Sequence, residues 1–326
     1  MQVTLSMITL RLCPVLLSLL TCSPHLLAGE VAQHGRLQVQ GNKIVDESGS
    51  AVSFAGMSLF WSQWMGQFYT KETVAWLHTD WKVPIVRAAM GIEAGGYLTN
   101  SIREEEKIRT VIDAAIANDM YVIVDWHDHH AELHSQQAAE FFGRIAATYG
   151  ASPNVIYEIY NEPLDVSWTN VLKPYANTVI NAIRKHDPDN LIIVGTPRWS
   201  QRVDVAATDP IEDANVAYSL HFYAGTHKDV LRQQAQEALD KGIALFVTEW
   251  GTVNATGDGE VDTDSVNRWI AFLQSNQISH LNWAISDKRE GAAVLQPASS
   301  PFGGWTDEQL TESGKLVRQL IRSWAR

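Results

Sequence analysis

The stretch Asn154-Val155-Ile156-Tyr157-Glu158-Ile159-Tyr160-Asn161-Glu162-Pro163 decides the fold prediction. Its first part collects β-branched and aromatic residues in a short run, which is typical of a buried strand. Because proline cannot donate to a sheet ladder, pairing should stop at Pro163 and leave Glu162 at the C-terminal end of the strand. A carboxyl group held there is a candidate general acid. An Asn-Glu-Pro turn that merely ends a strand is the simpler alternative.

A repeating alternation of strands and helices surrounds this stretch. Short apolar runs alternate with longer amphipathic stretches, which predicts a parallel sheet covered by helices. The eight expected strands are Val52–Met57, Pro84–Met90, Tyr121–His127, Val155–Asn161, Leu191–Gly195, Val216–His221, Ala244–Glu249 and Leu281–Ile285. Eight such units predict an α/β fold of the (β/α)8 TIM barrel type. An open doubly wound sheet is the alternative, but no Gly-x-Gly-x-x-Gly turn follows the first strand.

The N-terminal part of the chain carries two separate signals. Arg11 precedes the apolar run Leu12–Leu20, which is too short to span a bilayer and predicts a secretory signal peptide over residues 1–28. Residues 29–326 should then form one domain. Gly35–Glu47 alternates apolar and polar residues about Gly41-Asn42, which predicts a short β-hairpin at one end of the barrel. Because both cysteines lie in the signal segment, we expect no disulfide in the mature chain.

The composition narrows the class of ligand. The 326 residues include 12 Trp and 9 Tyr, and the formal net charge is −12. Large flat rings beyond the needs of a core suggest a surface that stacks on flat ligands such as sugars or bases. An acidic chain repels a phosphate backbone, so nucleic acid is not an expected partner. Sugars remain.

The C-terminal ends of the expected strands carry most of the chemically active side chains. Function in this type of barrel sits at that end. Seven of the eight strands end in, or are followed closely by, such residues: Phe60, Trp61 and Trp64; Arg87; Trp126 and His127; Asn161 and Glu162; His221, Phe222 and Tyr223; Glu249 and Trp250; and Trp283. This asymmetry supports the barrel prediction.

Three expected strands also carry a charge within apolar surroundings, namely Arg87, Asp125 and Glu158. Strand side chains alternate, so Glu158 should share a face with Glu162. A charge inside a barrel costs several kcal/mol unless it is paired and hydrogen-bonded. We therefore expect a polar cluster beneath the site, with Arg87 facing the carboxylates. A purely structural salt-bridge network is the alternative, and both roles are compatible.

A second strand repeats the pattern of the first stretch. The run from Ala244 to Gly251 is apolar, ends in Glu249 and is followed by a glycine. In a closed barrel Glu162 and Glu249 can face one another across the mouth. Two carboxyl groups that face each other across a sugar-binding cleft are the machinery of glycoside hydrolysis.

Together these residues show a resemblance to a known family. From Gly35 to Trp324 the chain resembles glycoside hydrolase family five, specifically its bacterial endo-β-1,4-glucanases (cellulases). The matching pieces are Phe54–Ser58, Val86–Met90, Asp125–His127, Val155–Pro163, His221–Tyr223, Thr248–Gly251, Asn282–Ala284 and Ser286–Gly291. The resemblance implies that Glu162 is the acid/base and Glu249 the nucleophile of a retaining, double-displacement mechanism.

The resemblance also implies supporting roles. Arg87 and Tyr223 would hold Glu249 ionised and oriented, because a cation and a hydroxyl donor both favour the carboxylate. Asn161 would bond the sugar 2-OH, and His127 and His221 would tune protonation and bind hydroxyls. The residues implied to bind substrate are the stacking platforms Trp64, Trp61 and Trp283 and the hydroxyl-binding pair Lys288 and Glu290. Many relatives have a histidine near Phe60, so the subsites on that side should differ here.

No metal or cofactor is expected. The segment Asp128–His134 is rich in histidine, but its spacing matches no standard zinc pattern, and the family chemistry needs no metal. The expected partner is a β-1,4-glucan, and the expected protein is a secreted monomer without a membrane span. Two alternatives stay open. One is hydrolysis of another β-glycan such as mannan, xyloglucan or mixed-linkage glucan. The other is a non-catalytic glucan-binding protein, which would have no use for two poised carboxyl groups.

Overall fold

The structure, a computed structural model, describes residues 2–4 and 29–324 and contains a closed barrel of eight parallel strands. The rest of the expected signal peptide, including Cys13 and Cys22, lies outside the described residues. The strands are β3 (Ala55–Leu59), β4 (Ile85–Gly91), β5 (Tyr121–His127), β6 (Val155–Glu158), β7 (Ile192–Val194), β8 (Val216–Tyr223), β9 (Leu245–Gly251) and β10 (His280–Ile285). They follow one another around the barrel in chain order, and β10 closes against β3. The (β/α)8 prediction is confirmed.

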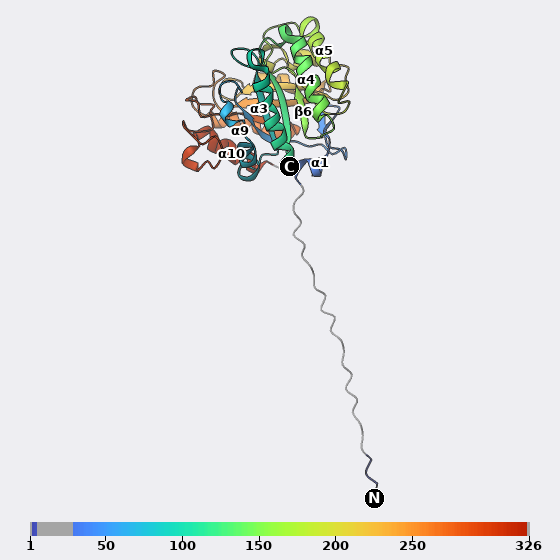
Figure 1. The fold of residues 1–326 in the computed structure, drawn as a ribbon, viewed down its shortest axis with the longest axis vertical. Coiled ribbons are helices and arrows are strands. Elements are labelled where there is room, and N and C mark those ends of the chain that lie inside the picture. Colours follow the sequence, from blue (N-terminus) through green and yellow to red (C-terminus); the bar gives the residue numbers. More distant parts are fainter. Residues whose placement is uncertain (1, 5–28, 325–326) are drawn as a thin grey trace.

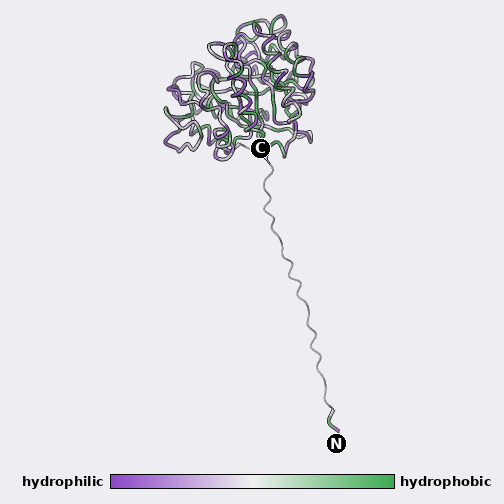
Figure 2. The backbone as a smooth tube through the Cα atoms, viewed as in Figure 1, coloured by the Kyte–Doolittle hydropathy of each residue, from purple (hydrophilic) through white to green (hydrophobic). Residues whose placement is uncertain are grey.

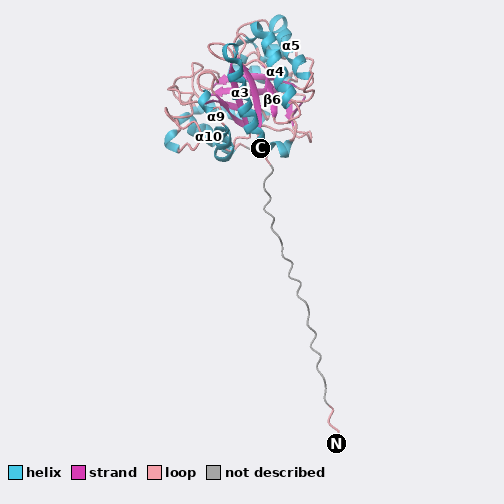
Figure 3. Cartoon of the chain, viewed as in Figure 1, coloured by secondary structure: helices cyan, strands magenta, loops and turns pink. Residues whose placement is uncertain are grey.

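Helices cover the outside of the strands (Figures 1 and 3). They are α2 (Lys71–Trp76), α3 (Tyr97–Ala117), α4 (Ser135–Tyr149), α5 (Lys173–Arg184), α7 (Val203–Ala206), α8 (Asp229–Asp240), α9 (Thr263–Asn276) and α10 (Glu312–Ser323). Two short helices lie at the ends of the barrel instead: α1 (Glu30–His34) at the N-terminal ends of the strands and α6 (Pro197–Ser200) after the C-terminal end of β7. The largest apolar cluster fills the space between strands and helices, where Trp126 packs on Phe141 and Phe142. Hydrophobic segments accordingly run through the middle of the fold in Figure 2. Within the described ranges, no helix has the length and apolar character needed to cross a membrane.

The inside of the barrel has an apolar layer and a polar layer. At the N-terminal ends of the strands, Tyr121, Ile123 and Phe246 form an apolar cluster with residues of the neighbouring strands. The predicted hairpin, β1 (Gln38–Gln40) and β2 (Lys43–Val45), is present and adds Ile44 to this cluster. One layer higher, six fully buried polar side chains replace the apolar ones: Ser58, Arg87, Asp125, Glu158, Ser219 and Thr248. The hairpin therefore closes the apolar end, and the polar layer lies nearer the C-terminal ends of the strands.

Only the strand Tyr121–His127 has the expected bounds, and five others differ from the prediction by one or two residues at an end. The two remaining strands differ by three residues at one end. The strand expected over Val155–Asn161 ends at Glu158, because the backbone N–H groups of Asn161 and Glu162 bond to the carbonyls of Trp126 and Asp128 (both 3.2 Å) outside the ladder. The first barrel strand was expected over Val52–Met57 and is Ala55–Leu59. Val52 donates to Ile44 of the hairpin (3.0 Å) instead of joining the barrel.

A β-bulge changes which side chains of β9 face the interior of the barrel. Ser219 of β8 pairs with Phe246, whereas His221 pairs with Glu249, so β9 holds one residue more than β8 between these pairs. Side chains alternate along a regular strand, so Glu249 would otherwise face away from Phe246 and toward the helices. The extra residue turns Glu249 to the barrel interior and Trp250 outward, where it packs on Phe222.

Candidate active site

The structure brings Glu162 and Glu249 together at the C-terminal end of the barrel. Glu249 comes from β9, and Glu162 from the segment after β6. One carboxylate oxygen of each residue and one ring nitrogen of His221 all lie within 4.8 Å of one another. The Glu249 residue is 4% exposed, and the Glu162 side chain is 14% exposed. Two carboxyl groups thus share one small volume with an imidazole.

Glu249 is held by a cation and a phenol. Arg87 donates from Nη1 to Oε2 (3.0 Å), and the Tyr223 hydroxyl donates to Oε1 (2.7 Å). Burial and the nearby Glu162 carboxylate raise the pKa of Glu249, while the charges of His221 and Arg87 and the Tyr223 hydroxyl oppose that rise. Gly251 permits this arrangement, because a Cβ on it would lie 2.3 Å from the Tyr223 ring. Both carboxylate oxygens of Glu249 are therefore engaged and fixed in direction.

Glu162 has different neighbours. Nδ1 of His221 lies 3.0 Å from Oε1, and Nδ1 of His129 lies 3.7 Å from Oε2. Burial lowers the pKa of His221, but Glu158 and Glu162 together with the charge of Glu249 outweigh it and raise the pKa to about 9. His221 is therefore a cation at neutral pH. Glu162 faces imidazoles, whereas Glu249 faces a guanidinium and a phenol.

The predicted polar cluster around Arg87 is confirmed. Its Nε donates to Glu158 (2.7 Å), and its Nη2 lies 3.0 Å from Asp125. Nη2 also donates to the amide oxygen of Asn161 (2.6 Å). Burial acts against the charge of Arg87, but Asp125, Glu158 and Glu249 together raise its pKa. One buried guanidinium thus ties three carboxylates and an amide into a rigid floor beneath the site.

His127 joins this floor to the aromatic side chains. Its Nδ1 lies 2.6 Å from Asp125, and burial lowers the pKa of the ring well below its usual value. The ring is parallel to Trp283, with 5.0 Å between centroids, and Trp61 meets it edge-on at 4.1 Å. His127 is therefore a neutral ring packed between two tryptophans.

The expected stacking residues differ in exposure. Trp64 is 53% exposed and packs on Trp61, with 5.0 Å between ring centroids. Trp283 is only 5% exposed, because Phe60 lies against it at 5.0 Å. Trp64 therefore offers a broad ring face, whereas Trp283 offers a small part of one.

Lys288 and Glu290 form an ion pair beside these rings. The Lys288 Nζ lies 2.5 Å from the Glu290 carboxylate and 5.5 Å from the centroid of the Phe60 ring. The side chain of Lys288 is about half exposed, at 52%. The structure thus places the pair next to the Phe60–Trp283 contact.

Trp199 was not predicted as a site residue. It lines a 360 Å³ cavity together with Glu162, Gln201, His221, Tyr223, His227 and Ala255. Its φ of 55° is left-handed, and its N–H donates to the Pro163 carbonyl (2.7 Å), so the turn is bonded to the segment that carries Glu162. Trp199 follows β7, the one strand whose C-terminal end showed no obvious chemistry. A tryptophan five residues after that strand was the available signal.

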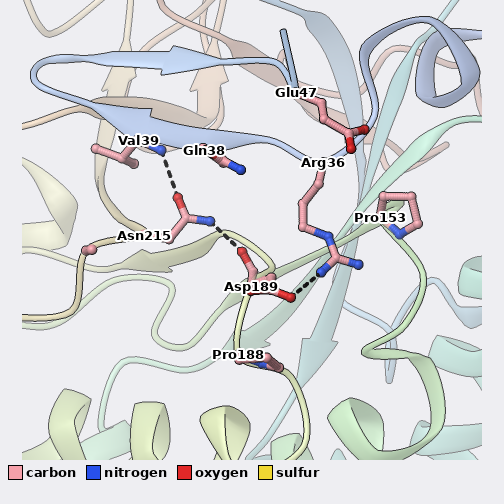
Figure 4. Close-up of a pocket in the computed structure, with 9 residues that line it drawn as sticks. Arg36, Gln38, Val39, Glu47, Pro153, Pro188, Asp189 and Asn215 are labelled. Atoms are coloured by element: carbon pink, nitrogen blue, oxygen red, sulfur yellow. Dashed lines mark hydrogen bonds and ion pairs between the residues drawn. The ribbon is translucent and has the colours of Figure 1, made fainter. Parts of the chain in front are cut away.

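A larger cavity of 530 Å³ lies at the other end of the barrel, beside the hairpin (Figure 4). Its polar groups already bond to one another. Arg36 pairs with Asp189 (2.9 Å), and Asn215 accepts from the Val39 N–H (2.8 Å) and donates to the Asp189 carbonyl (2.7 Å). These contacts anchor the hairpin to the loops that precede the strands.

Two groups of side chains among the described residues have the donor types and spacing of a metal site. One is Glu162, His221 and Glu249; the other is Glu93, Asp128 and His134. In the second group, Oδ1 of Asp128 accepts from the backbone N–H groups of His129 and His130, and Oδ2 lies 3.0 Å from Nδ1 of His134. The oxygens of Asp128 therefore already serve the turn that follows β5.

Curated relatives match most of the chain. Endoglucanase Z of Dickeya dadantii is 57% identical over 292 residues, which is 88% of this chain and 66% of that protein. An endoglucanase of Clostridium saccharobutylicum is 45% identical over 291 residues, again 88% of this chain and 65% of that protein. The chain thus spans about two thirds of the length of these relatives.

Solved structures agree with the sequence matches. A Cytophaga hutchinsonii protein has a TM-score of 0.90 at 51% identity and covers 90% of this chain and 97% of its own. The catalytic domain of a Thermobifida fusca endoglucanase has a TM-score of 0.87 at 36% identity and covers 91% of this chain and all of its own. Residues 45–289 match the family described as cellulase (glycosyl hydrolase family 5). With this match, these relatives and a barrel that carries two glutamates at its C-terminal end, the chain belongs to glycosyl hydrolase family 5.

Proposed function

We propose that the protein is a secreted, monomeric endo-β-1,4-glucanase that cleaves internal bonds of cellulose or soluble β-glucan with retention of configuration. The observation that carries this proposal is that one carboxylate oxygen of Glu162 and one of Glu249 lie within 4.8 Å of each other. Retaining enzymes hold their two carboxyl groups about 5–5.5 Å apart, and inverting enzymes about 6.5–9.5 Å apart to admit a water. The names of the relatives, and a Thermobifida fusca catalytic-domain variant in complex with cellotetraose, support a glucan substrate.

In the first step, Glu249 would attack the anomeric carbon while Glu162 protonates the leaving oxygen. Arg87 and Tyr223 suit the nucleophile role, because they hold Glu249 by both oxygens and favour its ionised form. In the second step, Glu162 would take a proton from the water that hydrolyses the glycosyl-enzyme. The cationic His221 beside Oε1 would stabilise the Glu162 carboxylate that the first step leaves.

Asn161 and His127 would act on the sugar at the cleavage point. Arg87 engages the amide oxygen of Asn161, so its amide nitrogen is the donor suited to the sugar 2-OH. His127 is neutral and fixed by Asp125, so it would serve as a hydroxyl-binding group rather than a proton donor.

The aromatic residues would hold the neighbouring glucose units. Trp61 contacts both His127 and Trp64, and Lys288, paired with Glu290, lies over the Phe60 ring that packs on Trp283. The residues that would bind the sugars on one side of the cut are therefore Trp61, Trp64, Trp283, Lys288 and Glu290. Trp199 lines the cavity at Glu162, on the side of the proton donor, so it would stack on the leaving part of the chain.

Substitution of the proposed nucleophile tests the mechanism. Glu249→Gln should still bind cellotetraose by calorimetry but lose at least about 10³-fold in kcat, because the attacking group is gone. Cleavage at the parent's rate would contradict the assignment. NMR of the parent reaction should show the β-anomer first, and initial α-anomer would contradict retention.

The identity of the glycan needs a separate measurement, because the fold and the carboxylate pair do not encode the sugar. The parent should reduce the viscosity of carboxymethyl-cellulose faster than that of galactomannan, xyloglucan or mixed-linkage glucan. A preference for one of the other polymers would change the substrate but leave the mechanism standing.

A further inference from the structure

Glu162 lies four residues beyond the end of β6, so the sheet does not position it directly. The segment after β5 holds its backbone instead. The Glu162 N–H donates to the Asp128 carbonyl (3.2 Å), and Nδ1 of His129 lies 3.2 Å from the Glu162 carbonyl. Because a carbonyl oxygen can only accept, Nδ1 of His129 must carry the hydrogen in this bond.

The same His129 nitrogen faces the carboxylate of Glu162. Nδ1 lies 3.7 Å from Oε2, on the oxygen opposite to the one that His221 contacts. The backbone of His129 is itself held by two hydrogen bonds, and its ring has an aromatic neighbour. The His129 N–H donates to Asp128 (2.8 Å), the Tyr160 hydroxyl donates to the His129 carbonyl (2.9 Å), and the ring lies 5.7 Å from that of Trp61. His129 is thus a fixed donor between Glu162 and an aromatic ring of the cleft.

We infer that His129 is a positioning residue for Glu162, holding its backbone and orienting its carboxyl group for proton transfer. The inference rests on the proposed acid/base role of Glu162. A misplacement of about 1 Å is enough to cost a proton donor much of its effect. Of the two carboxylate oxygens of Glu162, His221 contacts only Oε1. Loss of His129 would therefore free both Oε2 and the backbone carbonyl of Glu162.

Two substitutions of His129 test its hydrogen-bond donor and its aromatic ring separately. His129→Asn keeps an N–H donor near the position of Nδ1, whereas His129→Phe keeps a ring against Trp61 but removes the donor. The matched control is His130→Phe, because His130 is the next residue and its Nδ1 lies 3.6 Å from Glu93 rather than from Glu162.

The readout is the dependence of kcat/KM on the leaving group. Cellotetraose needs a proton donor for its first step, whereas dinitrophenyl β-cellobioside releases a stable phenolate and does not. Since general acid catalysis contributes about 10²–10⁴-fold, His129→Phe should lose about 10-fold on cellotetraose and less than about 2-fold on the dinitrophenyl substrate. His129→Asn and His130→Phe should stay near the parent on both. Thermal unfolding should show that all the variants are folded.

Glu162→Gln distinguishes failure of this inference from failure of the proposed function. Like His129→Phe, it should lose more kcat/KM on cellotetraose than on the dinitrophenyl substrate, and this split between the substrates should be larger. If Glu162→Gln shows the split and His129→Phe loses equally on both substrates, or not at all, the positioning role of His129 is overturned. If Glu162→Gln itself loses equally on both, the acid/base assignment falls, and the role of His129 falls with it.

Discussion

Glu162 and Glu249 are the same amino acid, and their neighbours make them chemically different. Glu249 has a permanent cation on one oxygen and a phenol on the other. Glu162 has the titratable His221 at 3.0 Å from one oxygen. These two kinds of surroundings suit the proposed roles, in which Glu249 attacks as a carboxylate and Glu162 exchanges a proton.

The hydroxyl of Tyr223 should matter for turnover. Tyr223→Phe removes a hydrogen bond to a charged group, worth about 1.5–3 kcal/mol, so kcat/KM should fall about 10- to 100-fold. The control is Tyr157→Phe, because the Tyr157 hydroxyl also donates to a carboxylate, that of Asp187 (2.6 Å), but away from the cleft. It should lose stability and keep its activity. Equal activity losses in the two variants would show that the Tyr223 bond has no special part in catalysis.

His221 should make stability depend on pH. Its pKa of about 9 lies above the ordinary 6.5, so the protonated ring stabilises the fold fully below about pH 6.5, and this contribution is lost as the pH rises through about 9. The shift corresponds to about 3 kcal/mol. Urea unfolding between about pH 6 and about pH 10 should therefore show a steeper loss in the parent than in His221→Asn.

His280 provides the control for this measurement. It is also fully buried, but burial lowers its pKa to about 3, so it stays neutral over the whole range. Above about pH 7.5 the ring is neutral in the unfolded chain as well, so His280→Asn should leave the slope of the parent unchanged from there to about pH 10. A His221→Asn variant with the slope of the parent would contradict the cationic state of His221.

At the level of strands, the bulge in β9 decides which side chains enter the barrel. It lets Thr248 and Glu249, which are adjacent in sequence, both contact interior groups. Thr248 bonds to Glu158 (2.5 Å), to Ser219 (2.6 Å) and to His221 (2.9 Å). This hydroxyl thus links β9 to β6 and β8 just below the site.

Removal of that link should lower both stability and activity. Thr248→Val leaves buried polar partners unsatisfied, which should cost about 1–3 kcal/mol in urea unfolding. It should also reduce kcat about 10-fold, through displacement of His221 by a fraction of an ångström. Thr252→Val is the matched control, since Thr252 is equally buried but bonds to Ser313 (2.8 Å) outside the barrel. A Thr248→Val enzyme with normal kcat would show that the polar layer is only structural.

In the whole molecule, the residues that stabilise the fold and the residues of the candidate site lie at opposite ends of the barrel. The apolar layer and the hairpin lie at the N-terminal ends of the strands, and the carboxyl pair and the aromatic rings lie at the other end. This is the division expected for a (β/α)8 barrel. Substitutions at the two ends should therefore have different consequences.

One substitution at each end tests this division. Ile44→Ala opens a cavity under the hairpin and should cost about 2–5 kcal/mol of unfolding free energy without a change in kcat. Trp64→Ala removes a half-exposed ring and should raise KM about 3- to 10-fold with little change in stability. Melting curves and initial rates check both. A fall in kcat for Ile44→Ala would mean that the two ends are mechanically coupled.

Local patterns in the sequence were enough to predict the barrel and the polar layer. The alternation of side chains along each strand placed Asp125 and Glu158 inside, and the cost of burying their charge required a partner such as Arg87. The position of the glutamates near the ends of two apolar runs indicated the carboxyl pair. These features follow from neighbours along the chain and from the period of a strand.

Only the tertiary contacts determined how the side chains of the candidate site are oriented. The early end of β6, the bulge that turns Glu249 inward, the turn that presents Trp199 and the contact of His129 with Glu162 all depend on bonds between segments far apart in the chain. A local pattern reports which face of a strand is buried, but not the register between strands or the path of a loop. Those are set by hydrogen bonds and packing that exist only once the barrel has closed.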